Sequence, residues 1–368
     1  MRETLRRHRR ALHQIPELGH DLPETAAYVR GALEKLPCTV FSPVPNAVCA
    51  FFDAGKKDAV AFRADMDALP IAEKSACSFA SRHPGRMHAC GHDGHMAMLL
   101  GLAERIPALL EMLPNNVLLI FQPAEETDGG ARLICETGLL ERYHVLRVFG
   151  LHLWPGLPAG KLFTRPDALM AKSSEVDVEI AGKSAHISRA GEGADALYAG
   201  AAFLCRVYEF SRRLASEGTP HLLKFGLLES GTVRNALSAH TVLRGSLRVF
   251  SPEGFSALRG GMREIADGLE RETGCVFTVS LSEGYPAVVN DPALWTHVRA
   301  VLGADAPREL PEPVTAGEDF SFYQQRVPGL FAFLGVGPGE PLHSAAFAFD
   351  EDVLQSGLDY YEKLLRME

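Results

Sequence analysis

The sequence contains no long apolar run. None of its segments approaches the roughly eighteen consecutive apolar residues that mark a membrane-spanning helix. The basic stretch at its start, MRETLRRHRRALHQ, is not followed by an apolar segment. It predicts an amphipathic helix with Leu5 and Leu12 facing inward, and not a secretion signal. We therefore expect a soluble cytoplasmic protein with no membrane partner.

Positive charge is also scarce. The 37 Lys and Arg residues are outnumbered by 46 Asp and Glu residues, which gives a formal net charge of −9. No basic run flanked by aromatic residues is present, so the sequence offers no long-range positive field for a phosphate backbone. We expect no nucleic-acid partner. An anionic small molecule would need a few Arg or His side chains that reverse the sign of the charge locally.

Several familiar catalytic motifs are missing. The sequence has no GxSxG nucleophile elbow, no GxxxxGK[ST] phosphate loop and no strand-linked GxGxxG. Its seven cysteines are scattered and odd in number, unlike the disulfide framework of a small secreted domain. Cys90 stands out because it lies between two histidines in a polar turn. A Cys90 nucleophile with His92 as its base is conceivable, but it explains neither the Glu125-Glu126 pair nor His152.

The first half of the chain has an α/β pattern. Residues 59–64, 117–122 and 145–151 are typical of buried strands, and each runs into a polar cluster, with a helix expected over residues 94–106. In open α/β sheets, functional sites form at the carboxyl ends of the strands. The three polar clusters therefore predict one shared site.

The pattern changes after residue 171 and returns near residue 287. The segment between follows the order β-α-β-β-α-β of a ferredoxin-like unit, over residues 175–180, 194–214, 222–228, 241–250, 252–273 and 276–281. A further buried strand is expected at residues 329–335. The predicted fold is α/β: a mixed, mainly parallel sheet in a first domain of residues 1–171 and 287–368, with an inserted ferredoxin-like α+β domain of residues 172–286.

The densest group of reactive side chains is the segment MHACGHDGH. It places three histidines, a cysteine and an aspartate within eight residues at a predicted strand-to-helix turn, namely His88, Cys90, His92, Asp93 and His95. Thiolate, imidazole and carboxylate are the groups that bind Zn²⁺, Mn²⁺ and similar ions. This segment therefore predicts a metal site.

Two further segments add potential ligands at strand ends. Glu125 and Glu126 follow the strand in FQPAEE, which favours a division of work: one carboxylate binds metal and the other takes a proton from a metal-bridging water. His152 follows the apolar run in GLHLWPG, and His343 lies in PLHSAAF near the C-terminus. Each of these histidines is weak evidence when taken alone.

Two pairs of acidic residues have open roles. Asp65 and Asp67 in RADMDALP are candidate ligands, partners that orient a histidine, or residues of a solvated turn before Pro70. Glu318 and Asp319 in TAGEDFSFY have a similar ambiguity, with helix capping as the alternative.

With these residues identified, the chain resembles the aminoacylase branch of the co-catalytic metallopeptidase family. That branch includes hippurate hydrolase, N-acetyldiaminopimelate deacetylase, bacterial N-acyl-amino-acid amidohydrolases and plant hydrolases of indoleacetic acid conjugates. The resemblance covers essentially the whole chain and runs in order through LHQIPELG, RADMDALPI, GRMHACGHDGHMAMLLG, FQPAEE, GLHLWPGLPAG, AGEDFSFY and LHSAAFAFDED.

The resemblance implies that the first domain is the catalytic domain and that the inserted domain is a lid. It also implies two divalent metal ions, with Zn, Mn, Co and Ni as the candidates. The ligands that it implies are Cys90, His92, Glu126, His152 and His343. It further implies that Glu125 is the general base and that Asp65 and Asp67 belong to the active-site aspartate segment.

In the inserted domain, the resemblance implies that His186 of GKSAHISR stabilises the oxyanion that develops on the substrate during the reaction. It also implies that the chain forms a homodimer through this domain, and His186 could then act across the dimer interface. Asn235 and Arg248 are candidate contacts for a substrate carboxylate, although a turn and a strand edge would also account for them. The expected activity is hydrolysis of the amide bond of an N-acyl-L-amino acid. The alternatives are a dipeptidase or carboxypeptidase with the same metals, or a binding protein without turnover.

Overall fold

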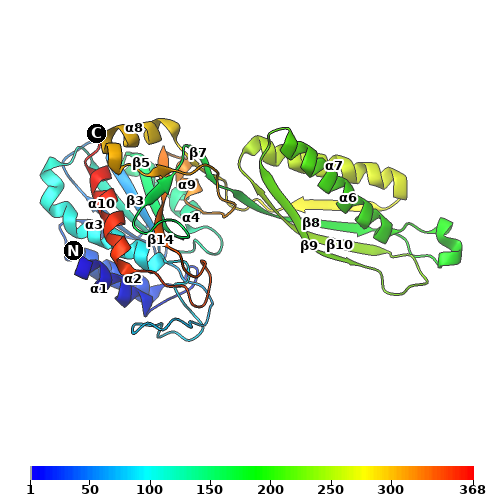
Figure 1. The fold of residues 1–368 in the computed structure, drawn as a ribbon, viewed down its shortest axis with the longest axis horizontal. Helices are drawn as coiled ribbons and strands as arrows, with labels where there is room; N and C mark the ends of the chain where they lie inside the picture. The colour runs from blue at the N-terminus through cyan, green and yellow to red at the C-terminus, as the bar shows by residue number, and fades with distance from the viewer. Residues whose placement is uncertain (1) are drawn as a thin grey trace. The chain divides into compact units, whose positions relative to one another are not determined.

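The structure is a computed structural model that describes residues 2–368. The chain forms two compact units, each with its own core (Figure 1). The larger unit comprises the chain up to Leu169 together with Val288–Pro313 and Asp319–Glu368. The second unit comprises Met170–Ala287 and the short segment Val314–Glu318. This short segment was assigned to the catalytic domain by the sequence pattern.

The larger unit is built on an eight-stranded sheet in the order β1-β2-β4-β3-β5-β14-β6-β13. Its strands are β1 (Thr39–Phe41), β2 (Val48–Phe52), β3 (Ala59–Asp65), β4 (Asn116–Gln122), β5 (Val145–Pro155), β6 (Leu162–Thr164), β13 (Arg308–Glu309) and β14 (Gly329–Gly337). The pairs β4-β3, β3-β5, β5-β14 and β6-β13 are parallel, and the other three are antiparallel. The predicted mixed, mainly parallel sheet is confirmed. Two short strands, β7 (Asp167–Met170) and β12 (Val288–Asn290), form a separate pair.

Helices pack around this sheet. They are α1 (Arg2–His13), α2 (Pro23–Leu33), α3 (His92–Leu109), α4 (Gly130–Glu136), α5 (Leu139–Arg142), α8 (Pro292–Leu302), α9 (Ser321–Gln324) and α10 (Leu354–Leu365), with short 3₁₀ turns η1 (Leu110–Met112), η3 (Gly303–Asp305) and η4 (Glu351–Val353). Helix α3 packs against α1, α10 and β3. Its buried side chains therefore surround the helix and are not confined to one face.

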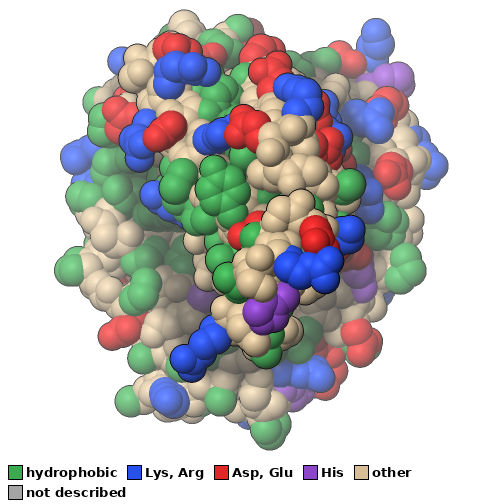
Figure 2. Space-filling view, turned by 90° about the vertical axis from the view of Figure 1, so that its right-hand side faces the viewer, with side chains coloured by type: hydrophobic (Ala, Val, Ile, Leu, Met, Phe, Trp, Pro, Cys, Tyr) green, Lys and Arg blue, Asp and Glu red, His purple; other side chains and the backbone are tan. Residues whose placement is uncertain are grey.

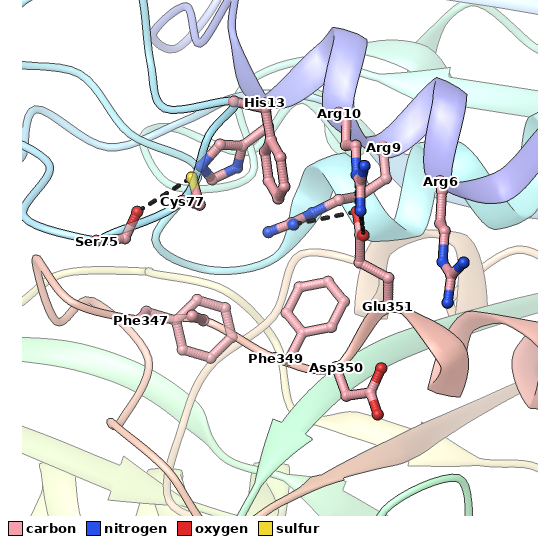
Figure 3. A pocket seen from close by; sticks show the side chains of 12 residues that line it. Arg6, Arg9, Arg10, His13, Ser75, Cys77, Phe347, Phe349, Asp350 and Glu351 are labelled. Carbon is pink, nitrogen blue, oxygen red and sulfur yellow. Dashed lines mark hydrogen bonds and ion pairs between the residues drawn. The ribbon is translucent and has the colours of Figure 1, made fainter. Parts of the chain in front are cut away.

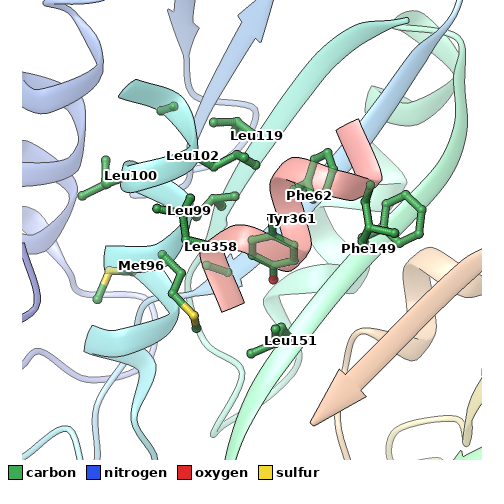
Figure 4. Packing of buried hydrophobic residues seen from close by; sticks show 14 of the residues in the cluster. Phe62, Met96, Leu99, Leu100, Leu102, Leu119, Phe149, Leu151, Leu358 and Tyr361 are labelled. Atoms are coloured by element: carbon green, nitrogen blue, oxygen red, sulfur yellow. The ribbon is translucent and has the colours of Figure 1, made fainter. Parts of the chain in front are cut away.

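A large apolar core packs against α3. Leu99 of α3, Leu358 and Tyr361 of α10, and Phe62 of β3 belong to one cluster of buried side chains (Figure 4). The sequence pattern placed the helix at residues 94–106, whereas it begins at His92. His92 and His95 thus both lie in its first turn, which a rigid apolar core supports.

The second unit is an antiparallel sheet covered by two helices. Its elements are β8 (Lys172–Ala181), η2 (Ile187–Glu192), α6 (Ala196–Ser216), β9 (His221–Ser230), β10 (His240–Val249), α7 (Pro252–Thr273) and β11 (Val276–Leu281), with the sheet order β11-β8-β10-β9. Val176, Val178 and Ile180 alternate with less buried residues along β8 and share a core with side chains of α6 and α7. The predicted ferredoxin-like order is confirmed.

Candidate metal centre

The carboxyl ends of three neighbouring parallel strands meet at one edge of the larger sheet. Strand β3 ends at Asp65, and β4 ends at Gln122 shortly before Glu125 and Glu126. The expected position of His152 after its strand is wrong, because β5 continues to Pro155 and His152 lies inside it. His152 still faces the same site, because its ring lies against the rings of His92 and His95.

The five predicted metal ligands converge at this edge. Cys90 Sγ lies 3.4 Å from His152 Nε2, and His343 Nε2 lies 3.2 Å from Glu126 Oε1. His92 Nε2 lies 3.8 Å from the same Glu126 oxygen. Three overlapping groups each hold ligand atoms within 4.8 Å of one another: Cys90 with His92 and His152, Cys90 with Glu126 and His343, and His92 with Glu125 and Glu126.

Backbone conformation helps to place two of these segments. Ala124 and His343 are non-glycine residues with φ values of 60° and 65°, in the left-handed region that such residues rarely adopt. Strained positions of this kind persist where the surrounding structure enforces them, and they cluster at functional sites. The His343 amide donates a hydrogen bond of 2.9 Å to the Ala89 carbonyl, which ties the C-terminal loop to the Cys90 segment.

Asp67 connects the His92 segment to the Glu125–Glu126 turn. Its carboxylate accepts hydrogen bonds of 3.0 Å from the backbone N–H groups of Glu125 and of Glu126. Its backbone carbonyl oxygen lies 2.8 Å from His92 Nδ1. When His92 donates from Nδ1 to this carbonyl, Nε2 is left as the lone-pair nitrogen that faces Glu126. Asp67 is thus a partner that orients these side chains and not a residue of a solvated turn.

Asp65 acts through His95. Asp65 Oδ1 lies 2.6 Å from His95 Nδ1, while His95 Nε2 accepts a hydrogen bond of 2.9 Å from the Leu153 amide. Both ring nitrogens of His95 are therefore engaged. Burial alone would raise the pKa of Asp65, but the neighbouring side chains of His92, His95 and Arg63 hold that pKa well below its usual range.

Arg63 is the centre of a buried network that the sequence reasoning missed. The side chain is 1% exposed and donates to Asp65 Oδ2 at 2.7 Å, to Asp319 Oδ1 at 2.6 Å and to Gln122 Oε1 at 2.8 Å. Asp319 Oδ2 also accepts from the Ala131 amide at 3.0 Å. Asp319 is therefore an ion-pair partner of Arg63. An arginine inside the apolar strand AVAFRAD was the signal available in the sequence.

The donor set fits divalent cations. His92 Nε2 is buried without a hydrogen-bond partner among the described residues. Burial, together with the charges of Glu126 and Glu125, raises the pKa of the Cys90 thiol well above its ordinary value, and burial lowers the pKa of His152 to about 3. A buried thiol, imidazoles and carboxylates that face one another are typical ligands of zinc and related ions.

The remaining predicted site residues lie in the second unit. His186 is exposed, with Nδ1 2.8 Å from Ser188 Oγ, and the Ile187 amide donates to the Asn235 carbonyl at 3.1 Å. Asn235 and His186 therefore lie on neighbouring segments. Arg248 is half-buried, pairs in register with Ser173, and donates to Ser246 Oγ at 2.8 Å.

Strand β10 separates these two groups. The His186 segment adjoins the end of β10 near His240, because Gly182 bonds to Ala239, whereas Arg248 is the penultimate residue at the other end. Eight residues of extended strand span about 26 Å. Within one copy of this unit, His186 and Arg248 are too far apart to hold the same small molecule.

Comparison with known proteins agrees with this geometry. The fold and donor set define a two-domain hydrolase of the metallopeptidase type. The chain belongs to peptidase family M20/M25/M40, whose model matches residues 61–367. It is 35% identical to an uncharacterised hydrolase of Staphylococcus epidermidis over 371 residues, covering 98% of this chain and 96% of that protein.

Two solved structures are similar over nearly the whole chain. The structure of a putative aminohydrolase from methicillin-resistant Staphylococcus aureus has a TM-score of 0.92 at 30% identity and covers 99% of this chain and 95% of its own. The YXEP protein of Bacillus subtilis, described as a dinuclear metal binding peptidase of the M20 family, has a TM-score of 0.87 at 29% identity, with 99% and 97% covered. Across the described residues, no helix has both the length and the apolar character needed to cross a membrane.

Proposed function

We propose that this hydrolase cleaves the amide bond of an N-acyl-L-amino acid. It would use two divalent ions held by Cys90, His92, Glu126, His152 and His343, with Glu125 as the general base. The observation that carries this proposal is the convergence of these five side chains from four separate segments beside a second carboxylate, Glu125, whose backbone N–H is fixed by Asp67. A site that only bound metal for structural purposes would not need this additional carboxylate.

Such ions, when bound, supply Lewis acidity that polarises an amide carbonyl and lowers the pKa of water. Glu125 would then accept a proton from the attacking water while the water oxygen forms a bond to the carbonyl carbon. The carboxyl group returns this proton to the amide nitrogen as the C–N bond breaks, which releases the carboxylic acid and the free amino acid. Glu125 is only 7% exposed, so bulk water would not compete for this transfer.

His186 is proposed as the donor that stabilises the tetrahedral oxyanion, and Asn235 and Arg248 as contacts for the substrate carboxylate. The separation of His186 from Arg248 along β10 favours a homodimer in which each site takes His186 from a second copy of the chain. The edge strand β9 exposes Leu222, Leu227 and Leu228. Figure 2 shows that hydrophobic side chains lie scattered among charged ones on one face of the molecule. These features support dimerisation through this unit.

A dipeptidase or carboxypeptidase with the same metal centre is the second candidate. The description of the Bacillus subtilis YXEP protein as a peptidase favours it. The chemistry of the two candidates is the same, and they differ only in the group attached to the scissile amide. Substrate preference therefore decides between them.

Removing and restoring metal tests the function directly. We expect the chelated protein to lose hydrolysis and to regain it with Zn²⁺, Mn²⁺, Co²⁺ or Ni²⁺, because the convergent donor atoms, among them the unpartnered His92 Nε2, fit a bound cation. The reloaded enzyme should then be assayed with N-acetyl and N-benzoyl amino acids and with dipeptides that share the same C-terminal residue. Faster turnover of dipeptides would overturn the acylase proposal, and hydrolysis that survives chelation would overturn the metal mechanism.

His186→Ala should reduce turnover by about a hundredfold to a thousandfold, the usual loss when an oxyanion donor is removed. Metal content should not change, since His186 is not among the proposed ligands. The exposed His297 on α8 offers a control, and His297→Ala should retain full activity. Normal turnover by His186→Ala would show that this histidine has no part in the reaction.

A further inference from the structure

A second group of potential metal ligands lies outside the candidate metal centre. It consists of His13 at the end of α1 and of Glu73 and Cys77 in the loop before the MHACGHDGH segment. One ligand atom from each residue lies within 4.8 Å of the other two. The His13 side chain is 2% exposed, and that of Glu73 is 6% exposed. The loop thus buries its acidic side chain against the helix end.

His13 is oriented as metal-binding histidines commonly are. Its Nδ1 lies 2.8 Å from Asp93 Oδ2, and its Nε2 points to Glu73 Oε1 at 3.0 Å. A histidine ligand usually donates its second ring N–H to a carboxylate, which fixes the ring and its tautomer. Asp93 is itself held by Arg9 at 2.8 Å. The Asp93–His13 pair therefore presents Nε2 in a fixed direction.

Two of the three distances between donor atoms are close to those around a tetrahedral zinc ion, and the third lies within 4.8 Å. With Zn–N and Zn–O bonds of about 2.0 Å and a Zn–S bond of about 2.3 Å, tetrahedral geometry separates N from O by about 3.3 Å and S from O by about 3.5 Å. The corresponding distances are 3.0 Å from His13 Nε2 to Glu73 Oε1 and 3.6 Å from Cys77 Sγ to the same oxygen. Small side-chain shifts would place an ion between the three donors.

A cavity of about 340 Å³ adjoins the cluster (Figure 3). His13, Ser75 and Cys77 are among its lining residues, and Ser75 Oγ lies 3.3 Å from Cys77 Sγ. The cavity gives an ion an entry route from solvent. It also leaves space for water as a fourth ligand.

Orphaned polar atoms beside the cluster form an independent observation. His88 is 1% exposed, and neither of its ring nitrogens has a hydrogen-bond partner within residues 2–368. Its ring centroid lies 6.4 Å from that of His13. Asp93 Oδ1 is likewise buried without a partner. Buried polar atoms without partners are costly, and a hydrated cation close by would supply donors and positive charge.

We propose that His13, Glu73 and Cys77 bind a third divalent ion, Zn²⁺, that clips the loop to helix α1. Zn–N, Zn–O and Zn–S bonds form, and the protons displaced from His13 and from the Cys77 thiol pass to solvent. The charges balance, because Zn²⁺ and Arg9 offset the three negative charges of Glu73, Asp93 and the Cys77 thiolate. This crosslink between the loop and α1 restricts the motion of the segment that leads to Cys90 and His92. It does not depend on which amide the enzyme cleaves.

Alkylation of Cys77 tests this proposal at a single residue. The chelated full-length protein would be treated with iodoacetamide before and after adding three equivalents of Zn²⁺, with modification of each cysteine followed by peptide mass spectrometry. Because zinc-bound thiolate is a poor nucleophile, Cys77 should react at least about tenfold more slowly with zinc. The exposed Cys205 should react at the same rate in both conditions.

Glu73→Gln provides the matched variant, since it preserves size and leaves the proposed catalytic ligands intact. In this variant, zinc should no longer protect Cys77. Elemental analysis after gel filtration should find one zinc fewer per chain in Glu73→Gln and in Cys77→Ser than in the wild type. Equal Cys77 alkylation with and without zinc, protection that persists in Glu73→Gln, or equal zinc content in all three proteins would overturn the proposal.

Discussion

Glu125→Gln should abolish most hydrolysis while leaving the metal centre and the fold intact. We expect kcat to fall by about a hundredfold to ten-thousandfold, the usual contribution of a positioned general base. The amide of glutamine has nearly the same shape as the carboxyl group but cannot accept the proton. The hydrogen bond from the backbone of residue 125 to Asp67 does not involve the side chain and should survive. Steady-state kinetics and metal analysis on the same preparation would measure both effects.

The matched control is Glu136→Gln, an exposed glutamate in α4, which should retain full activity. Binding of an N-acyl amino acid by the Glu125→Gln protein separates an enzyme from a binding protein. An enzyme should bind this ligand with little change in Kd and fail to cleave it. Hydrolysis within a few fold of the wild-type rate would show that Glu125 is not the base.

Local signals explain why some elements could be predicted closely. Helix α7 was expected at residues 252–273 and has those bounds. Ser251 accepts a hydrogen bond from the Gly254 amide at the N-cap, Pro252 occupies the first turn, and Gly274 ends the helix with a φ of 69°. Each of these is a sequence-readable start or stop signal.

Other features depend on contacts that no local pattern encodes. Strands β1 and β2 were not predicted, because β1 is only three residues long and joins the edge of the sheet through antiparallel pairing with β2. The length of β5 beyond His152 depends on its pairing with β14, nearly two hundred residues away. Periodicity in a single segment cannot report such long-range pairing.

In the candidate site, too, some features could be read from local sequence and others depend on contacts between distant residues. Residue types in MHACGHDGH and FQPAEE were sufficient to nominate donors, since few other roles combine thiol, imidazole and carboxylate at strand ends. The roles of Asp65 and Asp67 could not be separated, because the first acts through His95 and the second through backbone atoms of the Glu125 turn. Hydrogen bonds to backbone leave little trace in the sequence.

Arg63→Met should destabilise the larger unit by about 3–5 kcal/mol, the cost of removing one partner from a buried ion pair. Asp65 and Asp319 would lose their arginine while remaining buried, and β3, β4 and the Asp319 segment would lose the side chain that joins them. Both tryptophans, Trp154 on β5 and Trp295 on α8, lie in this unit. Tryptophan fluorescence during urea unfolding of the chelated protein would therefore follow this unit by itself.

Lys363→Met removes a cation from an exposed ion pair with Asp305 in the same unit, and it should cost far less than Arg63→Met because solvent screens exposed pairs. Adding Asp319→Asn to Arg63→Met should recover part of the loss, since one of the two buried carboxylate charges is then gone. A cost for Arg63→Met no larger than that of Lys363→Met would mean that Arg63 does not hold the site together. The position of Asp65, and through it of His95 beside His152, would then have to come from packing of the apolar strands alone.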